Sequence, residues 1–416
     1  MSAQDKHPAA VLLDGRKAWS VAILVFICFF VVETGEQRVP PILPVLYDEM
    51  GLSILEGGTL QSVLGWGSLI SALPAAWILL KAKPKLTMGI AVAMPAASGI
   101  IGAVWDTYVG LCVSSCLSGL AIGILGVICA SIIDEWFSPE KRGLPNGILL
   151  GTYPVSVLFM LYGSPVLCEQ FGFQSIWWAG AVIAAIGIVI VFLFLPNNSP
   201  YSEAHSGGEQ QGVEKVKVST LLKNKNLWMV LLGFGLFDVT FYGLNTYSPS
   251  ILTDNLNADL ELANLVTSVM FIALIPANVI TGLLLNKAGV RNRKFIPAIG
   301  LIGLGVGVLL AFTTDSLNTA IVALIVAGVA TGMCPSSFFT IGPDCIKSPA
   351  YIGIIVALVT LFQNLGIAIG PLVAGGLVEA AGNNWAAAGI PLAVISIAGA
   401  VACLLINNKP AEEDVR

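Results

Sequence analysis

Three ionisable residues stand close together inside the first long apolar stretch of the sequence, which runs from about residue 18 to residue 46. Glu33, Glu36 and Arg38 fall within six positions, and Arg38 is the one basic residue of twenty outside the short polar segments and the two ends. Charge at the centre of a membrane-spanning segment costs about 2.5 to 3.5 kcal/mol on insertion scales, so it is usually kept for function or pairing. The carboxylates could carry a proton, and the guanidinium could bind a carboxylate or phosphate through two parallel hydrogen bonds.

The position of Arg38 allows two interpretations. If the first helix begins at Trp19, Arg38 lies about 28 Å along its axis, near the far side of an apolar layer about 30 Å thick. Arg38 could then be an anchor that extends its charge to the water interface. However, the apolar sequence continues over residues 39–46, and Gly35 and Pro40-Pro41 predict an irregular segment. Irregular backbone at membrane depth is tolerated where it faces protein or a water-filled cavity, which favours a functional site.

A fourth ionisable residue, Asp238, stands about eleven residues into a later apolar run, near the middle of a spanning helix. It is either a group that binds a coupling proton or cation, or a protonated structural residue bonded to a neighbouring helix. Glu33 and Glu36 are three positions apart and share one helix face, so they are alternative candidates for the coupling role. The candidate ion-coupling residues are therefore Glu33, Glu36 and Asp238.

Uncharged polar residues within the apolar runs are candidates for contact with a small polar solute. Asn245, for example, lies two helical turns after Asp238 on the same face. The alternative for each such residue is a hydrogen bond between helices, worth about 0.6 kcal/mol on average. Together with Arg38, the candidate substrate-binding residues are Gln37, Gln61, Tyr153, Tyr242, Asn245, Gln363 and Asn364.

Other kinds of site lack their signatures in this sequence. Cys112 and Cys116 share a helix face, but no histidine or third cysteine joins them, which indicates packing rather than a metal site. His7 and His205 lie in polar segments. No glycine-rich phosphate loop, catalytic triad or nucleotide-binding domain is visible, and the net charge of −5 gives no reason to expect a nucleic-acid partner. We therefore expect no catalytic residues, no enzyme activity, no metal and no cofactor.

The composition predicts the elements that hold these residues. Of 416 residues, 56% are hydrophobic and 11% charged, against about 25% charged in a soluble protein, which indicates an integral membrane protein. The first apolar run is too long for a signal peptide, so no cleaved leader is expected. Twelve apolar runs are long enough to span a membrane: 18–46, 57–80, 86–105, 107–133, 146–168, 175–195, 227–252, 262–286, 294–313, 317–343, 350–381 and 385–407.

Basic residues occupy alternate gaps between these runs and both ends of the chain. The positive-inside rule then places both termini in the cytoplasm. The longest polar stretch, 196–226, predicts a flexible cytoplasmic linker between six runs and six runs. We therefore predict an N-terminal six-helix bundle over 1–195 and a C-terminal six-helix bundle over 227–416.

The two halves resemble each other, which favours an internal duplication. Three residues of the loop after the fourth run recur 210 positions later: Asp134, Pro139 and Gly143 correspond to Asp344, Pro349 and Gly353.

Two loops carry motifs of a known family. Trp136-Phe137-Ser138-Pro139-Glu140-Lys141-Arg142-Gly143 resembles the WFPxxxRG signature of the major facilitator superfamily. The segment from Gly282 to Lys294 resembles the GxxxDRxGRRK motif of that superfamily, with Asn286 in place of the acid. The equivalent first-half loop, 81–85, has lost the Asp and Gly of this motif. The resemblance covers the whole chain and implies an all-α membrane protein, with twelve transmembrane helices in two pseudo-symmetric six-helix bundles around a central cavity.

Within the superfamily, the second run resembles the organic anion:cation symporters. Their pattern GxxxSxxxWG followed by PxGW corresponds to Gly58, Ser62, Trp66, Gly67, Pro74 and Trp77, with Ala76 in place of the Gly of PxGW. Pro371-Leu372-Val373 and Gly375 fit the same branch. Those symporters carry an Asp-Arg pair in the first helix, and its Arg meets the substrate carboxylate. Arg38 falls near that place, with Gln37 instead of the Asp. The acid and Arg that many of them hold in the fourth helix are absent between Ser114 and Ile133.

The resemblance implies a secondary active transporter of a small, carboxylate-like organic anion, which works by alternating access and is coupled to a proton or cation gradient. The expected partners are the anionic substrate, the proton or cation and the lipid bilayer, and we expect a monomer. The expected location is the plasma (cell inner) membrane, as a multi-pass protein. The alternatives are a proton-coupled exporter of amphipathic compounds, for which more aromatic lining is expected, and a non-transporting receptor on the same fold.

Overall fold

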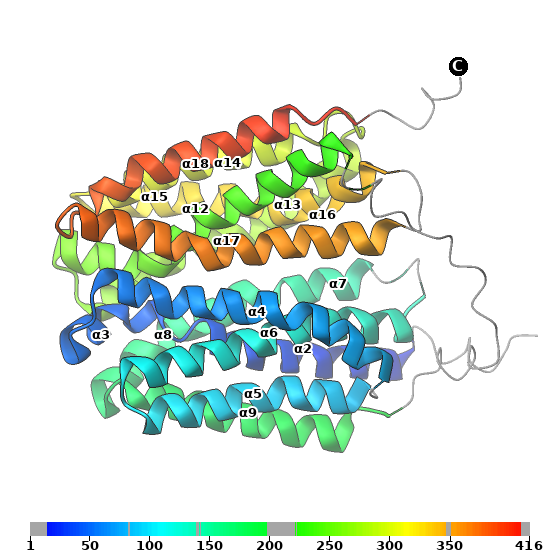
Figure 1. Cartoon of the computed structure of the whole chain (residues 1–416), viewed down its shortest axis with the longest axis horizontal. Helices are drawn as coiled ribbons and strands as arrows, with labels where there is room; N and C mark the ends of the chain where they lie inside the picture. Colours follow the sequence, from blue (N-terminus) through cyan, green and yellow to red (C-terminus); the bar gives the residue numbers. More distant parts are fainter. Residues whose placement is uncertain are drawn as a thin grey trace, which may run out of the picture. The chain divides into compact units, whose positions relative to one another are not determined.

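The computed structural model describes residues 15–81, 84–138, 141, 143–197, 221, 223–346 and 351–408, and the regular structure of these residues is helical (Figure 1). The predicted all-α membrane fold is therefore confirmed. The elements are α2 (Arg16–Glu36), η1 (Pro40–Ile42), α3 (Leu43–Met50), α4 (Ile54–Lys81), α5 (Pro84–Val104), α6 (Tyr108–Trp136), α7 (Gly143–Leu150), α8 (Thr152–Phe171), α9 (Gln174–Phe194), α12 (Lys225–Leu256), α13 (Leu260–Lys287), α14 (Phe295–Phe312), α15 (Leu317–Gly332), α16 (Pro335–Asp344), α17 (Ile352–Ala380) and α18 (Ala386–Leu404).

Several residues named in the sequence motifs lie outside the described residues. They are Pro139, Glu140 and Arg142 of the WFPxxxRG-like loop, Ala82 and Lys83 of the first-half loop, Pro349, most of the linker 196–226, and the side chain of Trp77.

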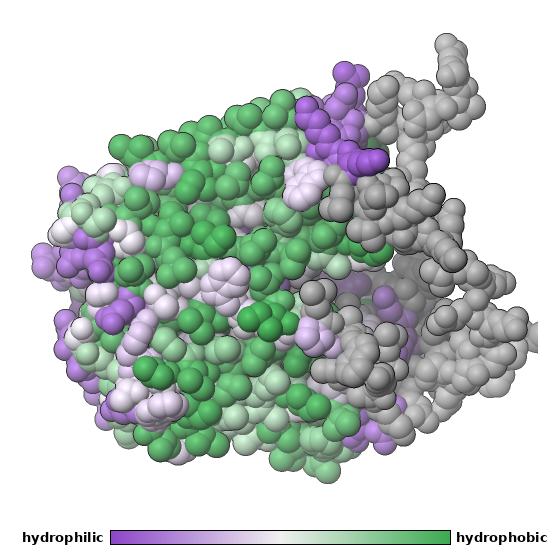
Figure 2. All heavy atoms as spheres, viewed as in Figure 1, coloured by the Kyte–Doolittle hydropathy of each residue, from purple (hydrophilic) through white to green (hydrophobic). Residues whose placement is uncertain are grey.

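Eleven of the described helical segments are long and apolar enough to cross a membrane. They coincide with eleven of the twelve predicted runs, and the remaining run, 57–80, falls on α4. Apolar residues cover much of the face seen in Figure 2. Ile70, Leu193 and Val279 are exposed by 63%, 68% and 64%. An apolar surface of this extent fits lipid rather than water as its surroundings.

The first predicted run is interrupted, as Gly35 and the proline pair predict. Helix α2 ends at Glu36, the short 3-10 helix η1 begins at Pro40, and α3 follows directly. Proline lacks the amide hydrogen that continues the bonding of a helix, so the regular α-helix stops before the pair. Arg38 therefore lies between two helical segments rather than within one.

Close packing divides the chain into two compact units. Unit 1 contains Met1–Arg38, Trp66–Met160 and Leu167–Gln211, and unit 2 contains Val39–Gly65, Leu161–Val166 and Gly212–Arg416. The chain passes from unit 1 to unit 2 directly after Arg38 and returns within α4. This grouping follows packing rather than chain order, and the division into bundles over 1–195 and 227–416 stays a prediction.

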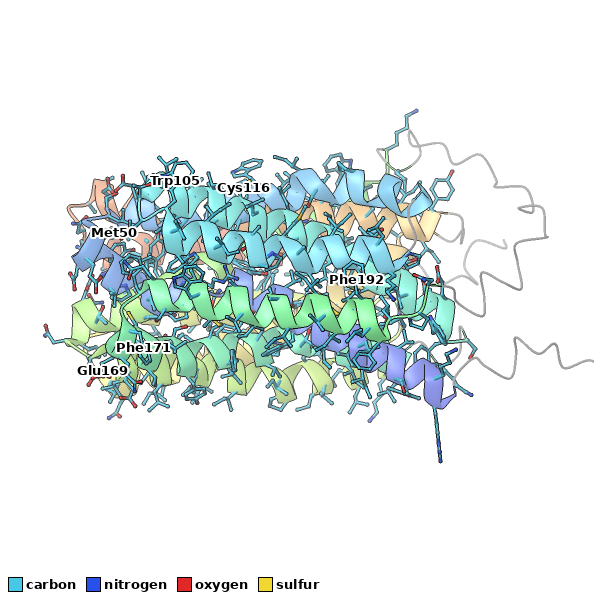
Figure 3. The ribbon with its side chains drawn as sticks, turned by 90° about the horizontal axis from the view of Figure 1, so that it is seen from below. Met50, Trp105, Cys116, Glu169, Phe171 and Phe192 are labelled. Carbon is cyan, nitrogen blue, oxygen red and sulfur yellow. The ribbon has the colours of Figure 1, made fainter. Side chains whose placement is uncertain are left out.

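Helices α2, α5, α6 and α9 form the core of unit 1, with α5 packed along α6 and α9. The core side chains are mostly small or β-branched, for example Val25 and Val92. Glycine allows the helices to approach: a Cβ atom at Gly99 would lie 2.6 Å from the carbonyl oxygen of Trp177. Phe192 lies toward one end of the unit (Figure 3), and its ring covers Gly89.

Helix α12 is the central helix of unit 2. It packs against α17 and α18 and also contacts α13, α14, η1 and α3. Every residue from Phe237 to Leu252 is buried, so this part of α12 is covered on all sides. A buried helix of this kind must place its polar side chains against neighbours, which makes α12 the main source of buried polar groups in unit 2.

Candidate functional site

Arg38 is buried in unit 1, with 2% of its surface exposed. Its Nη1 donates a hydrogen bond to Ser98 Oγ at 3.2 Å, and its Nη2 donates to the carbonyl oxygen of Pro95 at 3.3 Å. Both acceptors belong to α5. Within the described part of the chain, Nε makes no hydrogen bond. This buried position does not fit an anchor whose charge extends into water.

Helix α9 forms the other wall around the guanidinium. A Cβ atom at Gly180 would lie 2.6 Å from Nη2, 2.7 Å from Nε and 2.8 Å from Cζ of Arg38. The guanidinium therefore rests against bare helix backbone, and any larger residue at position 180 would collide with it. Arg38 is thus held between α5 and α9.

Two further serine hydroxyls orient the Ser98 hydroxyl, which accepts the hydrogen bond from Arg38 Nη1. Ser98 Oγ lies 2.9 Å from Ser114 Oγ and 2.8 Å from Ser118 Oγ, both on α6. Trp177 of α9 donates from Nε1 to Ser114 Oγ at 3.1 Å. These contacts join α5, α6 and α9 around the guanidinium. Hydroxyls and carbonyls orient a cation without cancelling its charge, so the arrangement keeps a positive centre that can attract an anion.

The two glutamates of the first run are also buried, each with 5% of its surface exposed. Ser156 of α8 donates from Oγ to Glu33 Oε2 at 3.3 Å and is also placed to donate to the carbonyl oxygen of Tyr153 at 2.8 Å. Unit 1 therefore brings the predicted residue Glu33 to the helix that carries Tyr153. Gln37 is 1% exposed, and its Nε2 has no hydrogen-bond partner among the described residues.

The remaining candidates lie in unit 2, and Asp238 is the acidic residue among them. Asp238 is 1% exposed and lies where α12 crosses α17: a Cβ atom at Gly366 would be 2.5 Å from its Cβ. The candidates Gln363 and Asn364 precede Gly366 by less than one helical turn. The structure therefore brings Asp238 to the part of α17 that carries these two amides.

Aromatic rings surround this part of α12. Phe237 and Phe241, which flank Asp238 in the sequence, stack at 5.8 Å, and Phe241 meets the edge of Tyr242 at 5.2 Å and of Phe271 at 6.4 Å. Tyr242 is therefore packed into an aromatic cluster. Asn245 is 2% exposed, and its Nδ2 has no hydrogen-bond partner in the described part of the chain.

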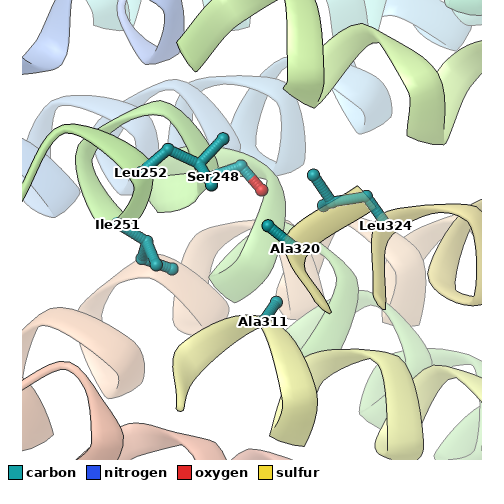
Figure 4. Close-up of a pocket in the computed structure, with 6 residues that line it drawn as sticks. All are labelled: Ser248, Ile251, Leu252, Ala311, Ala320 and Leu324. Carbon is teal, nitrogen blue, oxygen red and sulfur yellow. The ribbon is translucent and has the colours of Figure 1, made fainter. Parts of the chain in front are cut away.

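Gln61 of α4 is fully buried in unit 2, and neither atom of its amide has a hydrogen-bond partner among the described residues. A small pocket elsewhere in unit 2 is lined by Ser248, Ile251, Leu252, Ala311, Ala320 and Leu324 (Figure 4). Its volume of about 10 Å³ accommodates roughly one water molecule, so it is too small for an organic substrate. The described residues contain no group of three or more His, Cys, Asp and Glu that could hold a metal.

The sequence reasoning missed the residues that hold the charged groups. Ser98, Ser156 and Gly180 were not among the candidates. Ser114 and Ser118 stand one helical turn apart, which is a weak signal of a polar face, but serine and glycine are common packing residues in membrane helices. Nothing in their spacing links them to Arg38.

The comparisons with known proteins agree with this architecture. Residues 25–356 match the sequence profile of the Major Facilitator Superfamily. The chain belongs to this superfamily. It is therefore a membrane transporter by family, and the family named in the sequence analysis is confirmed.

Two relatives and one solved structure illustrate the likeness. The chain is 22% identical over 385 residues to the human "Sodium-dependent phosphate transport protein 1", covering 86% of this chain and 81% of the relative. It is 22% identical over 336 residues to the "Cis,cis-muconate transport protein" of Acinetobacter baylyi, covering 77% and 78%. The crystal structure of the nucleoside transporter NupG matches with a TM-score of 0.73 at 15% identity, covering 94% of this chain and 99% of that one. The last likeness shows the shared fold.

Proposed function

We propose that this transporter is a secondary active carrier of a small organic anion with a carboxylate group. It works by alternating access and is driven by a proton or cation gradient. The names of two relatives, for phosphate and for cis,cis-muconate, support an anionic substrate. The motif likeness to the organic anion:cation symporters supports the same class.

The observation that carries this proposal is the buried guanidinium of Arg38. A guanidinium has five donors, and the described hydrogen bonds of Arg38 go to one hydroxyl and one carbonyl. Neither acceptor is charged, so an arriving carboxylate would bring a negative charge to this positive centre. In surroundings of low polarity such a contact is stronger than in water.

For coupling, we propose that Asp238 exchanges the proton or cation, with Glu33 and Glu36 as the alternative candidates for this role. Asp238 is 1% exposed and its Cβ lies against the bare backbone of α17, so a permanent charge there is costly and proton exchange suits it. Glu33 accepts a hydrogen bond from Ser156 and belongs to the same unit as Arg38.

The surroundings of the transporter are part of the proposal. We propose a monomer in the plasma (cell inner) membrane. We also propose that both termini and the linker 196–226 lie in the cytoplasm, because basic residues occupy alternate gaps between the apolar runs. A cysteine reporter in the linker should react with an impermeant reagent from the cytoplasmic side. Reaction from outside in intact cells would contradict this orientation.

Uptake by the purified protein in proteoliposomes tests the function. A thermal-shift screen of carboxylates, phosphates and sulfonates selects the compound, and its radiolabelled form is then followed with and without a pH or sodium gradient. We expect a carboxylate to stabilise the protein and to accumulate when a gradient is present. Gradient-driven extrusion of amphipathic compounds would favour an exporter. Binding without any movement across the membrane would favour a receptor.

A further inference from the structure

The hydroxyl of Tyr247 joins three segments of unit 2. Tyr247 belongs to α12 and is completely buried. Its Oη lies 2.9 Å from the carbonyl oxygen of Ile54 in α4 and 3.1 Å from the carbonyl oxygen of Pro371 in α17. The hydroxyl has one proton, which it donates to either carbonyl or shares between them. The ring packs against Trp385 at 5.4 Å, so the side chain is fixed on that side as well.

Two glycines form the socket that receives this hydroxyl. A Cβ atom at Gly58 of α4 or at Gly375 of α17 would collide with Tyr247 Oη. Each glycine follows a carbonyl acceptor by four residues: Gly58 follows Ile54, and Gly375 follows Pro371. In a helix, the residue four positions later lies over the same face, so a missing side chain there leaves the carbonyl open to a third helix. The two motif glycines are therefore explained by one tyrosine.

A carboxylate strengthens the same junction, defined here as Tyr247, Gly58, Gly375 and Glu379. Glu379, near the end of α17, accepts a hydrogen bond through Oε2 from the backbone N–H of Leu55 at 3.0 Å. The first amides of a helix have no partner within it, and a carboxylate placed there also meets the positive end of the helix dipole. The Glu379 carboxylate of α17 thus caps the N-terminus of helix α4.

We propose that this junction is a gate of the transport cycle: Tyr247 holds the start of α4 against the end of α17 and must leave its glycine socket before these helices separate. The junction lies where α4 begins and α17 ends. This is the end of unit 2 that carries α3, away from α16 (Figure 1). The inference rests on the proposed alternating-access cycle, because only a cycle of that kind requires the helices to separate.

The bonds at the junction suit a contact that forms and breaks repeatedly. A single neutral hydrogen bond contributes little net free energy, whereas the close fit of a hydroxyl between two glycines is specific to one arrangement of the helices. A side chain added in the socket should therefore destabilise the arrangement in which α4 contacts α17, and it should leave the separated arrangement unchanged.

The test uses neighbouring glycines of α17 as a matched pair. Gly375→Ala places a methyl group against the Tyr247 hydroxyl. Among the described residues, a Cβ atom at Gly376 meets only Leu55 Cδ1 at 3.9 Å, which is an ordinary contact. Tyr247→Phe removes the hydroxyl and adds no atom. In the double variant, the Gly375 methyl group would still meet the ring carbon at 3.1 Å and the Ile54 carbonyl oxygen at 3.2 Å, which small shifts can relieve.

The measurement is the distance between spin labels on Glu49→Cys in α3 and Ala381→Cys after α17, both exposed in unit 2. The half-buried Cys112, Cys116 and Cys345 are first replaced by serine, and the other native cysteines are buried. Molecules in which the helices have separated give a long distance between the labels, and molecules in which they are in contact give a short one. We expect Gly375→Ala to raise the ratio of the long-distance to the short-distance population by at least about tenfold, and Tyr247→Phe to raise it by about twofold to tenfold. Gly376→Ala should match the unsubstituted protein, and the double variant should fall below Gly375→Ala.

Equal distance distributions for Gly375→Ala and Gly376→Ala would overturn the proposal. If Gly375→Ala does not fold, Tyr247→Phe carries the test, and an unchanged distribution in that variant is the contrary result. The measurement needs no substrate. A wrong substrate class would therefore leave these distances unaffected, whereas a wrong gate would leave carboxylate uptake intact.

Discussion

Unit 1 and unit 2 bury their ionisable groups in different surroundings. In unit 1, Arg38 donates a hydrogen bond to the hydroxyl of Ser98 in α5, and Glu33 accepts one from the hydroxyl of Ser156 in α8. In unit 2, Asp238 is 1% exposed and its Cβ lies against the bare backbone of α17. Hydroxyl partners hold a charge in one position, which suits recognition of a charged group. Close packing around a carboxyl group leaves little room for water and makes a permanent charge costly, which suits a group that gains and loses a proton.

This difference predicts a division of labour that experiments can separate. Substitutions around Arg38 should change the affinity for substrate, and substitution of Asp238 should change the use of the gradient. A protein in which both kinds of substitution had the same effect would show that the comparison is without functional meaning.

Arg38 should give the largest effect. Arg38→Gln should weaken carboxylate binding by roughly thirtyfold to several thousandfold, because a charged partner in a partly dry site is worth about 2 to 5 kcal/mol. Arg38→Lys should also weaken binding substantially, because an ammonium group cannot reproduce the planar fork. Calorimetry in detergent measures both affinities, and thermal unfolding shows whether each variant is folded. Unchanged affinity in folded Arg38→Gln would end the proposed role of this residue.

Gly180→Ala tests whether the position of Arg38 matters as well as its charge. The added methyl group would enter the space of the guanidinium, and overpacking of a well-packed site costs about 1 to 3 kcal/mol. We expect affinity to fall by roughly fivefold to a hundredfold. Gly126→Ala is the matched control, because a Cβ atom there meets none of the described residues within 4 Å outside its own stretch of helix. Equal affinities in the two variants would mean that substrate binding does not depend on the contact between Arg38 and α9.

Asp238→Asn should abolish accumulation while exchange of substrate across the membrane continues. With one coupled proton, a gradient of one pH unit can drive about tenfold accumulation, and the variant should reach only equal concentrations. Glu33→Gln is the comparison: if Asp238 carries the coupling ion, this variant should keep gradient-driven accumulation. Transport assays with radiolabelled substrate measure both quantities. If Glu33→Gln loses accumulation and Asp238→Asn keeps it, the coupling role belongs to unit 1.

Ser98→Ala should have the smallest effect. It removes one hydrogen bond to Arg38 and leaves the Pro95 carbonyl and the α9 wall in place, so we expect affinity to fall by about twofold to tenfold. Ser71→Ala is the control, because Ser71 is buried in the same unit and its hydroxyl bonds to its own helix at Ser68. A loss as large as that of Arg38→Gln would instead indicate that Ser98 contacts the substrate itself.

The sequence by itself determined the membrane class, the number and limits of the apolar runs, and the broken segment after Glu36. These features depend on local properties: the length of an apolar run against the thickness of the membrane, and the missing amide hydrogens of Pro40 and Pro41. Arg38 also stood out locally, because a basic residue within an apolar run is rare. The candidates for chemistry could therefore be named, but their partners could not.

Only the tertiary structure decided which groups surround those candidates. Ser98 lies 60 positions from Arg38, and Ile54 and Pro371 lie 193 and 124 positions from Tyr247. Helices in a membrane are apolar whether they face lipid or protein, so hydrophobic pattern does not choose their neighbours. That choice depends on shape, as at Gly180, Gly58 and Gly375, where a missing side chain admits one specific group. Such complementarity is a property of two helix surfaces in contact, and the amino-acid sequence does not show which two surfaces meet.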